Sequence, residues 1–119
     1  MSYKVKSITV FEKQVKKLFK KHSSLKNDLL DLVSLLKQNP ELGTPIGRHC
    51  YKIRLAIASK GKSKSGGARL ITNFVFIDKT VYLLSIYDKS AKDNLTDKEL
   101  DELLKYIYLY NFSQYNLVP

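Results

Sequence analysis

The chain has 119 residues, 44% hydrophobic and 27% charged, a composition that favours one globular domain spanning residues 1–119. Its net charge of +10 favours a polyanionic partner, nucleic acid before anionic membrane. We expect no membrane association, because the sequence has no apolar run long enough to cross a bilayer and no signal peptide. A single cysteine, Cys50, excludes an intrachain disulfide and favours the cytoplasm. With only two histidines besides, no metal site or other cofactor is expected.

Apolar spacing near the N-terminus predicts a strand followed by two helices. The strand is expected over Lys6–Val10, where β-branched residues gather. The first helix is indicated by apolar residues at helical spacing, namely Phe11, Val15, Leu18 and Phe19. Ser23 and Ser24 are expected to form the turn and N-cap of a second helix. That helix must end at Asn39, because Pro40 disfavours helical conformation in the residue before it.

In the middle of the chain the apolar period changes to that of strands. Apolar and polar residues alternate over Tyr51–Ala58, which predicts a half-buried strand. A second strand is expected over Ala68–Ile77 and a third over Val81–Tyr87, joined by a turn at Asp78-Lys79. A capping box from Thr96 to Glu99 then predicts the start of a last helix.

These elements, in the order β-α-α-β-β-β-α, predict the α+β class. We expect a small antiparallel sheet with an N-terminal helical hairpin and a C-terminal helix. Residues 59–67 are expected to form a flexible, lysine-containing connection. The uncharged, tyrosine-rich residues 106–119 fit a helix or a strand, and packing on the core or on a partner is the favoured interpretation.

Positive charge is concentrated in residues 48–69, which hold seven basic residues and no acid: Arg48, Lys52, Arg54, Lys60, Lys62, Lys64 and Arg69. Lys52 and Arg54 are two apart on a predicted strand, so they share a face roughly 6.6 Å from each other. A short hairpin can bring Arg69 beside them. Such a group favours phosphate binding, since arginine binds phosphate through its planar fork. The alternative is an exposed sheet face that is basic by chance, with the loop lysines simply solvated.

The runs Cys50–Leu55, Gly67–Ile71 and Tyr82–Lys89, with Asp93–Thr96 and the closing helix, resemble the RelE/HigB family of bacterial toxins in the RelE/ParE superfamily. The resemblance spans about residues 45–104, and the order of the predicted elements is that of the family's fold. It implies the toxin of a type II toxin–antitoxin system. Such a toxin is an mRNA interferase that usually acts on ribosome-bound mRNA and is held inactive by a cognate antitoxin.

The resemblance implies catalytic roles for Lys52, Arg54, Arg69 and Lys89, the last standing where the RelE branch often has arginine. Tyr87 is our substitute for a C-terminal tyrosine of that branch, and it suits stacking on a base. The expected RNA-binding residues are Arg48, Lys60, Lys62, Lys64 and Lys92. His49 is a further candidate base, although a lone loop histidine more often has no catalytic role.

Metal-free RNA cleavage needs a base for the 2′-OH, stabilisation of charge at the phosphate, and an acid for the 5′-oxygen. Because like charge disfavours an ammonium group, a lysine crowded by cations can share in proton transfer. Two other functions stay open. A ParE-like inhibitor of DNA gyrase has the same fold and needs no cationic cluster. A non-catalytic nucleic-acid-binding module is the other, although no helix-turn-helix with a basic recognition helix is present.

Overall fold

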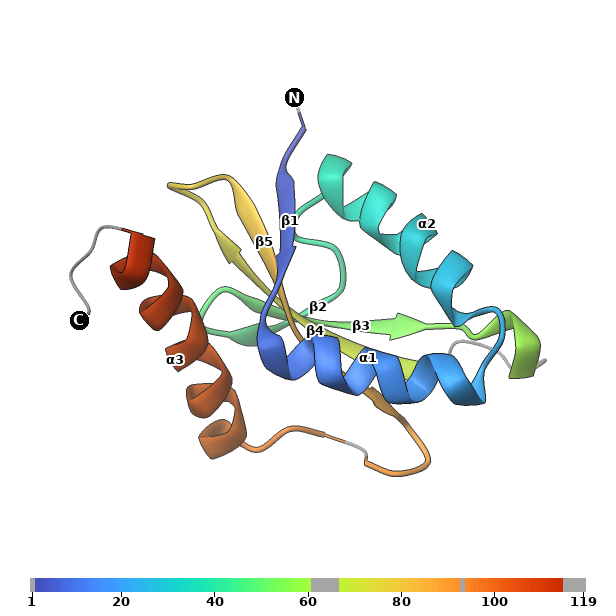
Figure 1. Cartoon of the computed structure of the whole chain (residues 1–119). Coiled ribbons are helices and arrows are strands. Elements are labelled where there is room, and N and C mark those ends of the chain that lie inside the picture. The colour runs from blue at the N-terminus through green and yellow to red at the C-terminus, as the bar shows by residue number, and fades with distance from the viewer. Residues whose placement is uncertain (1, 61–66, 93, 115–119) are drawn as a thin grey trace.

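The computed structural model describes residues 2–60, 67–92 and 94–114 of the chain. These residues form five strands, three α-helices and one short 3-10 turn, arranged as Figure 1 shows. In chain order the elements are β1 (Lys4–Ser7), α1 (Thr9–Lys21), α2 (Leu25–Gln38), β2 (Thr44–Gly47), β3 (Cys50–Leu55), η1 (Ala58–Lys60), β4 (Ala68–Val75), β5 (Thr80–Asp88) and α3 (Asp97–Gln114).

The strands form one sheet in the order β1-β5-β4-β3-β2, which with the helices gives the expected α+β class. The expected antiparallel meander is present as β3, β4 and β5. The expectation of a wholly antiparallel sheet was wrong for β1, which pairs with β5 in parallel from Lys4 opposite Thr80 to Ser7 opposite Leu83. Parallel pairing needs a long connection, and here all the elements between β1 and β5 supply it.

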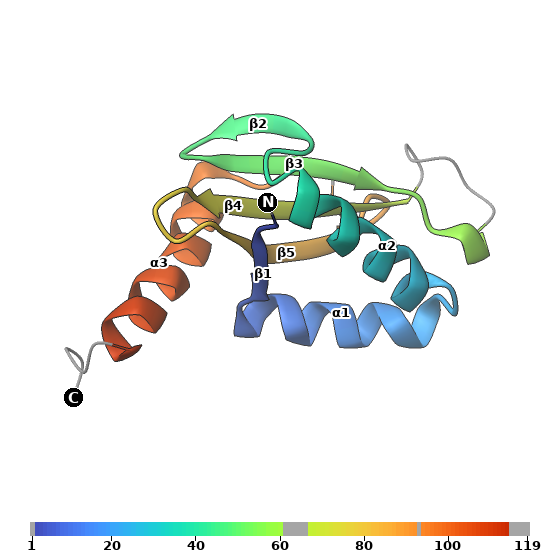
Figure 2. The ribbon, with the colours of Figure 1, turned by 90° about the horizontal axis from the view of Figure 1, so that it is seen from above.

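All three helices contribute to one hydrophobic core with the sheet. Apolar residues of α1 and α2 join one buried cluster with residues of the central strands: Phe11, Val15, Leu18, Leu25, Leu32, Leu36, Leu70, Leu84 and Ile86. Figures 1 and 2 show α3 lying apart from the α1–α2 hairpin. Its buried residues, Leu100, Leu103 and Ile107, belong to the same cluster. Within the described residues, no helix is both long and apolar enough to span a membrane.

The first strand lies earlier than expected, at Lys4–Ser7 instead of Lys6–Val10. The helical spacing of the buried residues explains the difference, because it extends backwards from Phe11 to Ile8. Ile8 is the N-cap of α1, and Val10 lies within the helix despite its β-branched side chain. Burial of the helix face therefore outweighs local strand propensity.

The first strand of the meander ends at Leu55, before the expected Ala58. Backbone N–H groups beyond it donate to side chains at the start of α2 instead of to a strand. The Ala58 N–H donates to Asp28 Oδ2 at 3.2 Å, and the Ser59 N–H donates to Ser24 Oγ at 2.8 Å. Ser24 is the N-cap residue of α2 as expected, but its hydroxyl accepts from the Ser59 N–H and donates to Asp28 Oδ2 at 2.7 Å, and it caps no N–H of its own helix.

Helix boundaries were predicted more accurately than strand boundaries. The second helix ends with Asn39 as its C-cap, and its N–H donates to the Leu35 carbonyl at 2.8 Å. The capping box is present, since the Thr96 N–H donates to Glu99 Oε1 at 3.0 Å and the Glu99 N–H donates to Thr96 Oγ1 at 3.1 Å. Helix α3 continues to Gln114, which answers the open question about the tyrosine-rich segment up to that residue.

One strand was missed altogether. All four residues of β2 are exposed and include Pro45 and Gly47, so no apolar alternation indicates a strand there. At the other hairpin, β4 ends at Val75 instead of the expected Ile77. Phe76 and Ile77 lie in the turn, 74% and 90% exposed, although both residue types favour strands.

Candidate functional site

A row of three predicted site residues crosses the centre of the sheet. Arg54 on β3 lies opposite Arg69 on β4, and Arg69 lies opposite Tyr87 on β5. Residues directly opposite on antiparallel strands project to the same face. Lys52 shares that face, since it lies two residues before Arg54. The hairpin geometry expected from the sequence therefore brings these four residues together.

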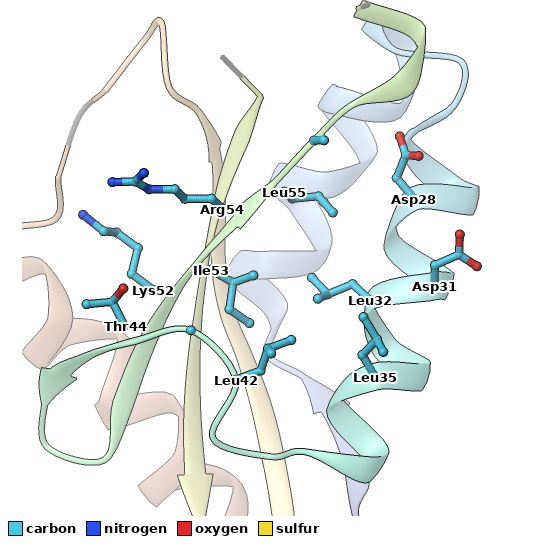
Figure 3. A pocket seen from close by; sticks show the side chains of 12 residues that line it. Asp28, Asp31, Leu32, Leu35, Leu42, Thr44, Lys52, Ile53, Arg54 and Leu55 are labelled. Carbon is cyan, nitrogen blue, oxygen red and sulfur yellow. The ribbon is translucent and has the colours of Figure 1, made fainter. Parts of the chain in front are cut away.

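Figure 3 shows that Lys52 and Arg54 project from β3 to one side, whereas Ile53 and Leu55 project to the other, toward α2. The strand thus separates a cationic face from the apolar core. We call the face that carries Lys52, Arg54, Arg69 and Tyr87 the cationic face.

The cations of this face differ in accessibility. The Arg54 side chain is exposed and Lys52 is half-buried. Arg69 is only 3% exposed, and its Nη1 donates to the neighbouring Ala68 carbonyl at 3.2 Å. An anion that approaches from solvent therefore meets Arg54 first, and Arg69 adds positive charge from beneath the surface.

Lys89 follows β5, and its side chain is exposed. Its backbone N–H donates to the Gly67 carbonyl at 3.2 Å, which joins the end of β5 to the start of β4. This contact places Lys89 beside the first residues of the strand that carries Arg69. Four of the five predicted catalytic residues thus lie near the Ala68 end of β4, namely Arg54, Arg69, Tyr87 and Lys89.

Acidic and amide side chains at and before the start of α3 lie against the basic residues. Lys52 Nζ donates to Asn94 Oδ1 at 2.8 Å, Arg48 forms an ion pair with Asp101, and Lys92 forms one with Glu99. The hydrogen bond from Lys92, helped by that from Thr96, lowers the pKa of Glu99 to about 2. The start of α3 and the segment before it therefore partly neutralise the cationic face.

The turn between β2 and β3 is strained. Arg48 and His49 have φ of 56° and 60°, a left-handed conformation that side chains other than glycine and asparagine seldom adopt. The Asn73 amide stabilises this turn, because its Nδ2 donates to the Arg48 carbonyl at 3.0 Å and to the His49 carbonyl at 3.4 Å. The turn presents Arg48 to Asp101 on α3.

A cavity of about 280 Å³ adjoins Tyr87 between α1, β5 and α3, and Lys92 and Glu99 also line it. At its edge Gln14 Oε1 accepts hydrogen bonds from Ser85 Oγ at 3.0 Å and from the Ile86 N–H at 2.9 Å. The last backbone hydrogen bond from this end of β1 is that of the Ile8 N–H to the Leu83 carbonyl at 3.2 Å, and farther along β5 Gln14 takes the place of a paired strand. Nothing in the sequence pattern indicated this role of Gln14.

The remaining predicted RNA-binding residues are less informative. Lys60 ends η1, and Lys62 and Lys64 lie outside the described residues. His49 is exposed in the strained turn.

Asn94 was missed as a contact of Lys52, because an amide carries no charge pattern that a sequence reveals. Among the residues that the structure describes, no three His, Cys, Asp or Glu side chains gather as a metal site would require.

Comparison with known proteins then places the chain in a family. The family model described as the RelE toxin of the RelE / RelB toxin-antitoxin system matches residues 8–116. The chain belongs to the RelE toxin family. The resemblance predicted from the sequence is thereby confirmed, and a toxin of a toxin–antitoxin system is the function class of this family.

Solved RelE structures share the fold. A mutant of the Escherichia coli toxin RelE in the free state matches with a TM-score of 0.56 and 20% identity, covering 88% of this chain and 97% of that chain. The isolated E. coli RelE toxin matches with a TM-score of 0.52 and 19% identity over 89% of this chain and 99% of that one. A RelE mutant in complex with a peptide of the antitoxin RelB matches with a TM-score of 0.56 and 19% identity, over 81% and 100%.

Proposed function

We propose that this RelE-family toxin is a metal-independent endoribonuclease that cleaves mRNA on the ribosome, in the cytoplasm, and so inhibits translation. The observation that carries the proposal is the register that places Arg54 opposite Arg69, with Lys52 on the same face. Three cations that share one sheet face together attract an anion of high charge density. The scissile phosphate of RNA is such an anion.

The roles follow from accessibility. Arg54 binds the phosphate from the solvent side, while the positive charge of Arg69 stabilises the additional negative charge of the transition state. Lys52 and Lys89 are the candidates for proton transfer, and Tyr87 for contact with a base. Arg48, Lys60, Lys62, Lys64 and Lys92 supply contacts to the RNA backbone, which position the strand without reading its sequence.

Substrate binding has to displace intramolecular partners. Lys52 donates to Asn94, and Lys92 and Arg48 are paired with acids of α3. RNA phosphates replace these partners when they bind. The exchange makes affinity depend on both salt and the α3 acids.

The partner of this toxin is an antitoxin, in keeping with the RelE structure solved in complex with an antitoxin peptide. We propose that it covers the region of residues 48–69 and 89–92, by negative charge or by bulk. A ParE-like action on gyrase, or nucleic-acid binding without cleavage, would not need four cationic or aromatic side chains converging on one sheet face.

The test is to map mRNA 5′ ends after brief induction of the toxin in growing cells. The proposal predicts growth arrest and new ends within translated regions. An Arg54→Ala variant at equal abundance should produce neither, while Lys26→Ala, an exposed lysine on α2, should act as the parent does. Arg54 is the better choice than the buried Arg69, whose truncation also changes packing. Arrest without new mRNA ends would contradict the proposal and point to another target.

A further inference from the structure

The cavity of about 280 Å³ between α1, β5 and α3 adjoins the cationic face. Tyr87 belongs to both, since it lines the cavity and lies opposite Arg69 on the neighbouring strand. Neighbouring strands are about 4.8 Å apart, a separation that one nucleotide spans. A nucleotide whose phosphate lies at Arg69 can therefore place its base beside Tyr87, at the cavity.

The lining of the cavity suits a small, planar and uncharged ligand. Its apolar wall is formed by Val10, Leu95 and Leu103. The aromatic ring of Tyr87 adds a surface on which a base can stack. Pockets for drug-sized ligands have about 300–1,000 Å³, so this smaller cavity has the size for a single nucleobase.

The charges around the cavity keep phosphate outside it. The charged residues of the lining are Lys92, Glu99 and Glu102, two carboxylates and one ammonium group. Lys92 is paired with Glu99, and Glu102 is paired with Lys105. The excess of negative charge repels a phosphate, which is bound more favourably at the cationic face. A neutral base is not repelled.

The amide of Gln14 is held in one orientation at the wall of this cavity. Its Oε1 accepts from Ser85 Oγ at 3.0 Å and from the Ile86 N–H at 2.9 Å. A backbone N–H only donates, so the oxygen of the amide must lie toward β5. Among the residues that the structure describes, the Gln14 Nε2 makes no hydrogen bond with another residue. Gln14 therefore offers a ligand two N–H donors and no acceptor.

Such a donor distinguishes two classes of base. Guanine and uracil carry a carbonyl oxygen, O6 or O4, at the position where adenine and cytosine carry an amino group. The carbonyl oxygen accepts from an amide N–H, whereas an amino group placed there is a second donor and leaves both donors without a partner. Support of the β5 edge accounts for the oxygen of Gln14 but gives no role to its amino group.

We propose that the cavity binds the base of the nucleotide beside the scissile phosphate, and that Gln14 selects guanine or uracil there over adenine or cytosine. This inference rests on the proposed function and adds a residue that reads the base. The cationic face fixes the position of the RNA backbone, and Gln14 supplies the contact that depends on sequence.

The substitution Gln14→Glu tests this role because it keeps the anchor and reverses the contact. One carboxylate oxygen still accepts from Ser85 and Ile86, while the other presents an acceptor where the parent has donors. Gln38→Glu, at an exposed glutamine of α2, adds the same charge away from the cavity and is the matched control. Thermal unfolding should show both variants folded.

The readout is the base composition beside the new mRNA 5′ ends after brief induction of each protein. At one position beside the cut, the parent and Gln38→Glu should favour guanine and uracil over adenine and cytosine roughly three- to tenfold, as expected for one hydrogen bond. Gln14→Glu should favour adenine and cytosine at that position. If all three proteins produce new ends with the same base composition, the proposed function stands and the role of Gln14 is overturned.

Nucleotide binding by the parent toxin gives a measurement that needs neither cleavage nor a folded variant. Guanosine and uridine monophosphates should shift the NMR signals of the Gln14 side-chain amide, and adenosine and cytidine monophosphates at equal concentration should shift them much less. If this selectivity is found in a toxin that cleaves no RNA, the proposed function fails and the base-binding cavity stands. Equal effects of all four nucleotides, or no effect of any, would overturn the cavity as a base-binding site.

Discussion

Arg54 and Arg69 lie directly opposite each other on the neighbouring antiparallel strands β3 and β4. Opposed residues have Cβ atoms about 4.5–5.5 Å apart, and like charges at this separation are destabilising. Arg69 is moreover 3% exposed, so its charge is poorly screened by water. A phosphate bound between the two guanidinium groups is attracted by both charges.

Removal of the accessible partner should therefore separate stability from activity. We expect Arg54→Ala to leave the free energy of unfolding unchanged or to raise it by about 0.2–1 kcal/mol, because the opposed charge is gone. The same variant should lose RNA cleavage. Urea unfolding and a cleavage assay on one preparation check both. A marked loss of stability would show that Arg54 supports the fold, and its loss of activity would then say nothing about phosphate.

Most substitutions lower the free energy of unfolding of a protein, but a glycine in the strained turn between β2 and β3 should raise it. His49 has φ of 60°, which costs a residue with a side chain about 1–2 kcal/mol. His49→Gly should therefore raise the free energy of unfolding by about 1 kcal/mol. Gly47, at φ +92° in the same hairpin, offers the matched control, because Gly47→Ala introduces strain and should lower stability. A destabilising His49→Gly would mean that the imidazole makes a contact worth more than the strain.

Acid should weaken the contact between α3 and the segment before it. The Lys92 hydrogen bond lowers the pKa of Glu99 from its usual 4.5 to about 2. Since the unfolded chain takes up this proton at higher pH, the contact stabilises the fold fully above about pH 4.5 and ceases to do so as pH falls toward about 2. Glu99→Gln should flatten the dependence of stability on pH within that window. Parallel curves for parent and variant, from thermal unfolding at several pH values, would contradict this assignment.

Antitoxin association should be fast at low salt and slow as salt screens the charges. The toxin carries +10, and the cationic face is the region that we propose the antitoxin covers. Stopped-flow association rates measured from about 50 to 500 mM salt should fall steadily. A flat profile would leave shape and apolar packing as the sole basis of recognition.

Local sequence signals were sufficient where a feature depends on neighbouring residues. The capping box at Thr96 and Glu99 and the helix end at Asn39 are of this kind, and both are present. The placement of Arg69 beside Arg54 followed from the short separation of two strands. In each case the determining atoms lie within a few residues or one hairpin, so spacing alone carries the information.

Features that depend on tertiary contacts could not be predicted. The exposed β2 has no apolar alternation, and the parallel orientation of β1 is set by a strand far along the chain. The burial of Arg69 and the hydrogen bond from Lys52 to Asn94 depend on residues that are far apart in the sequence. The sequence showed which cations gather, but their accessibility and partners come from the packing of distant elements.

The most direct test of RNA cleavage by the cationic face uses one RNA and its copy with a single 2′-deoxy substitution at the cut site. If the toxin activates the 2′-OH of its substrate, the parent RNA is cut to a 2′,3′-cyclic phosphate and the substituted copy is not cut. Binding of the two should be nearly equal, because the contacts of Lys52, Arg54 and Arg69 are to phosphate. Lys52→Ala and Lys89→Ala should each lower the cleavage rate more than they weaken binding. Cleavage of the 2′-deoxy copy at the parental rate would instead require an activated water, and the lysine-based mechanism would be wrong.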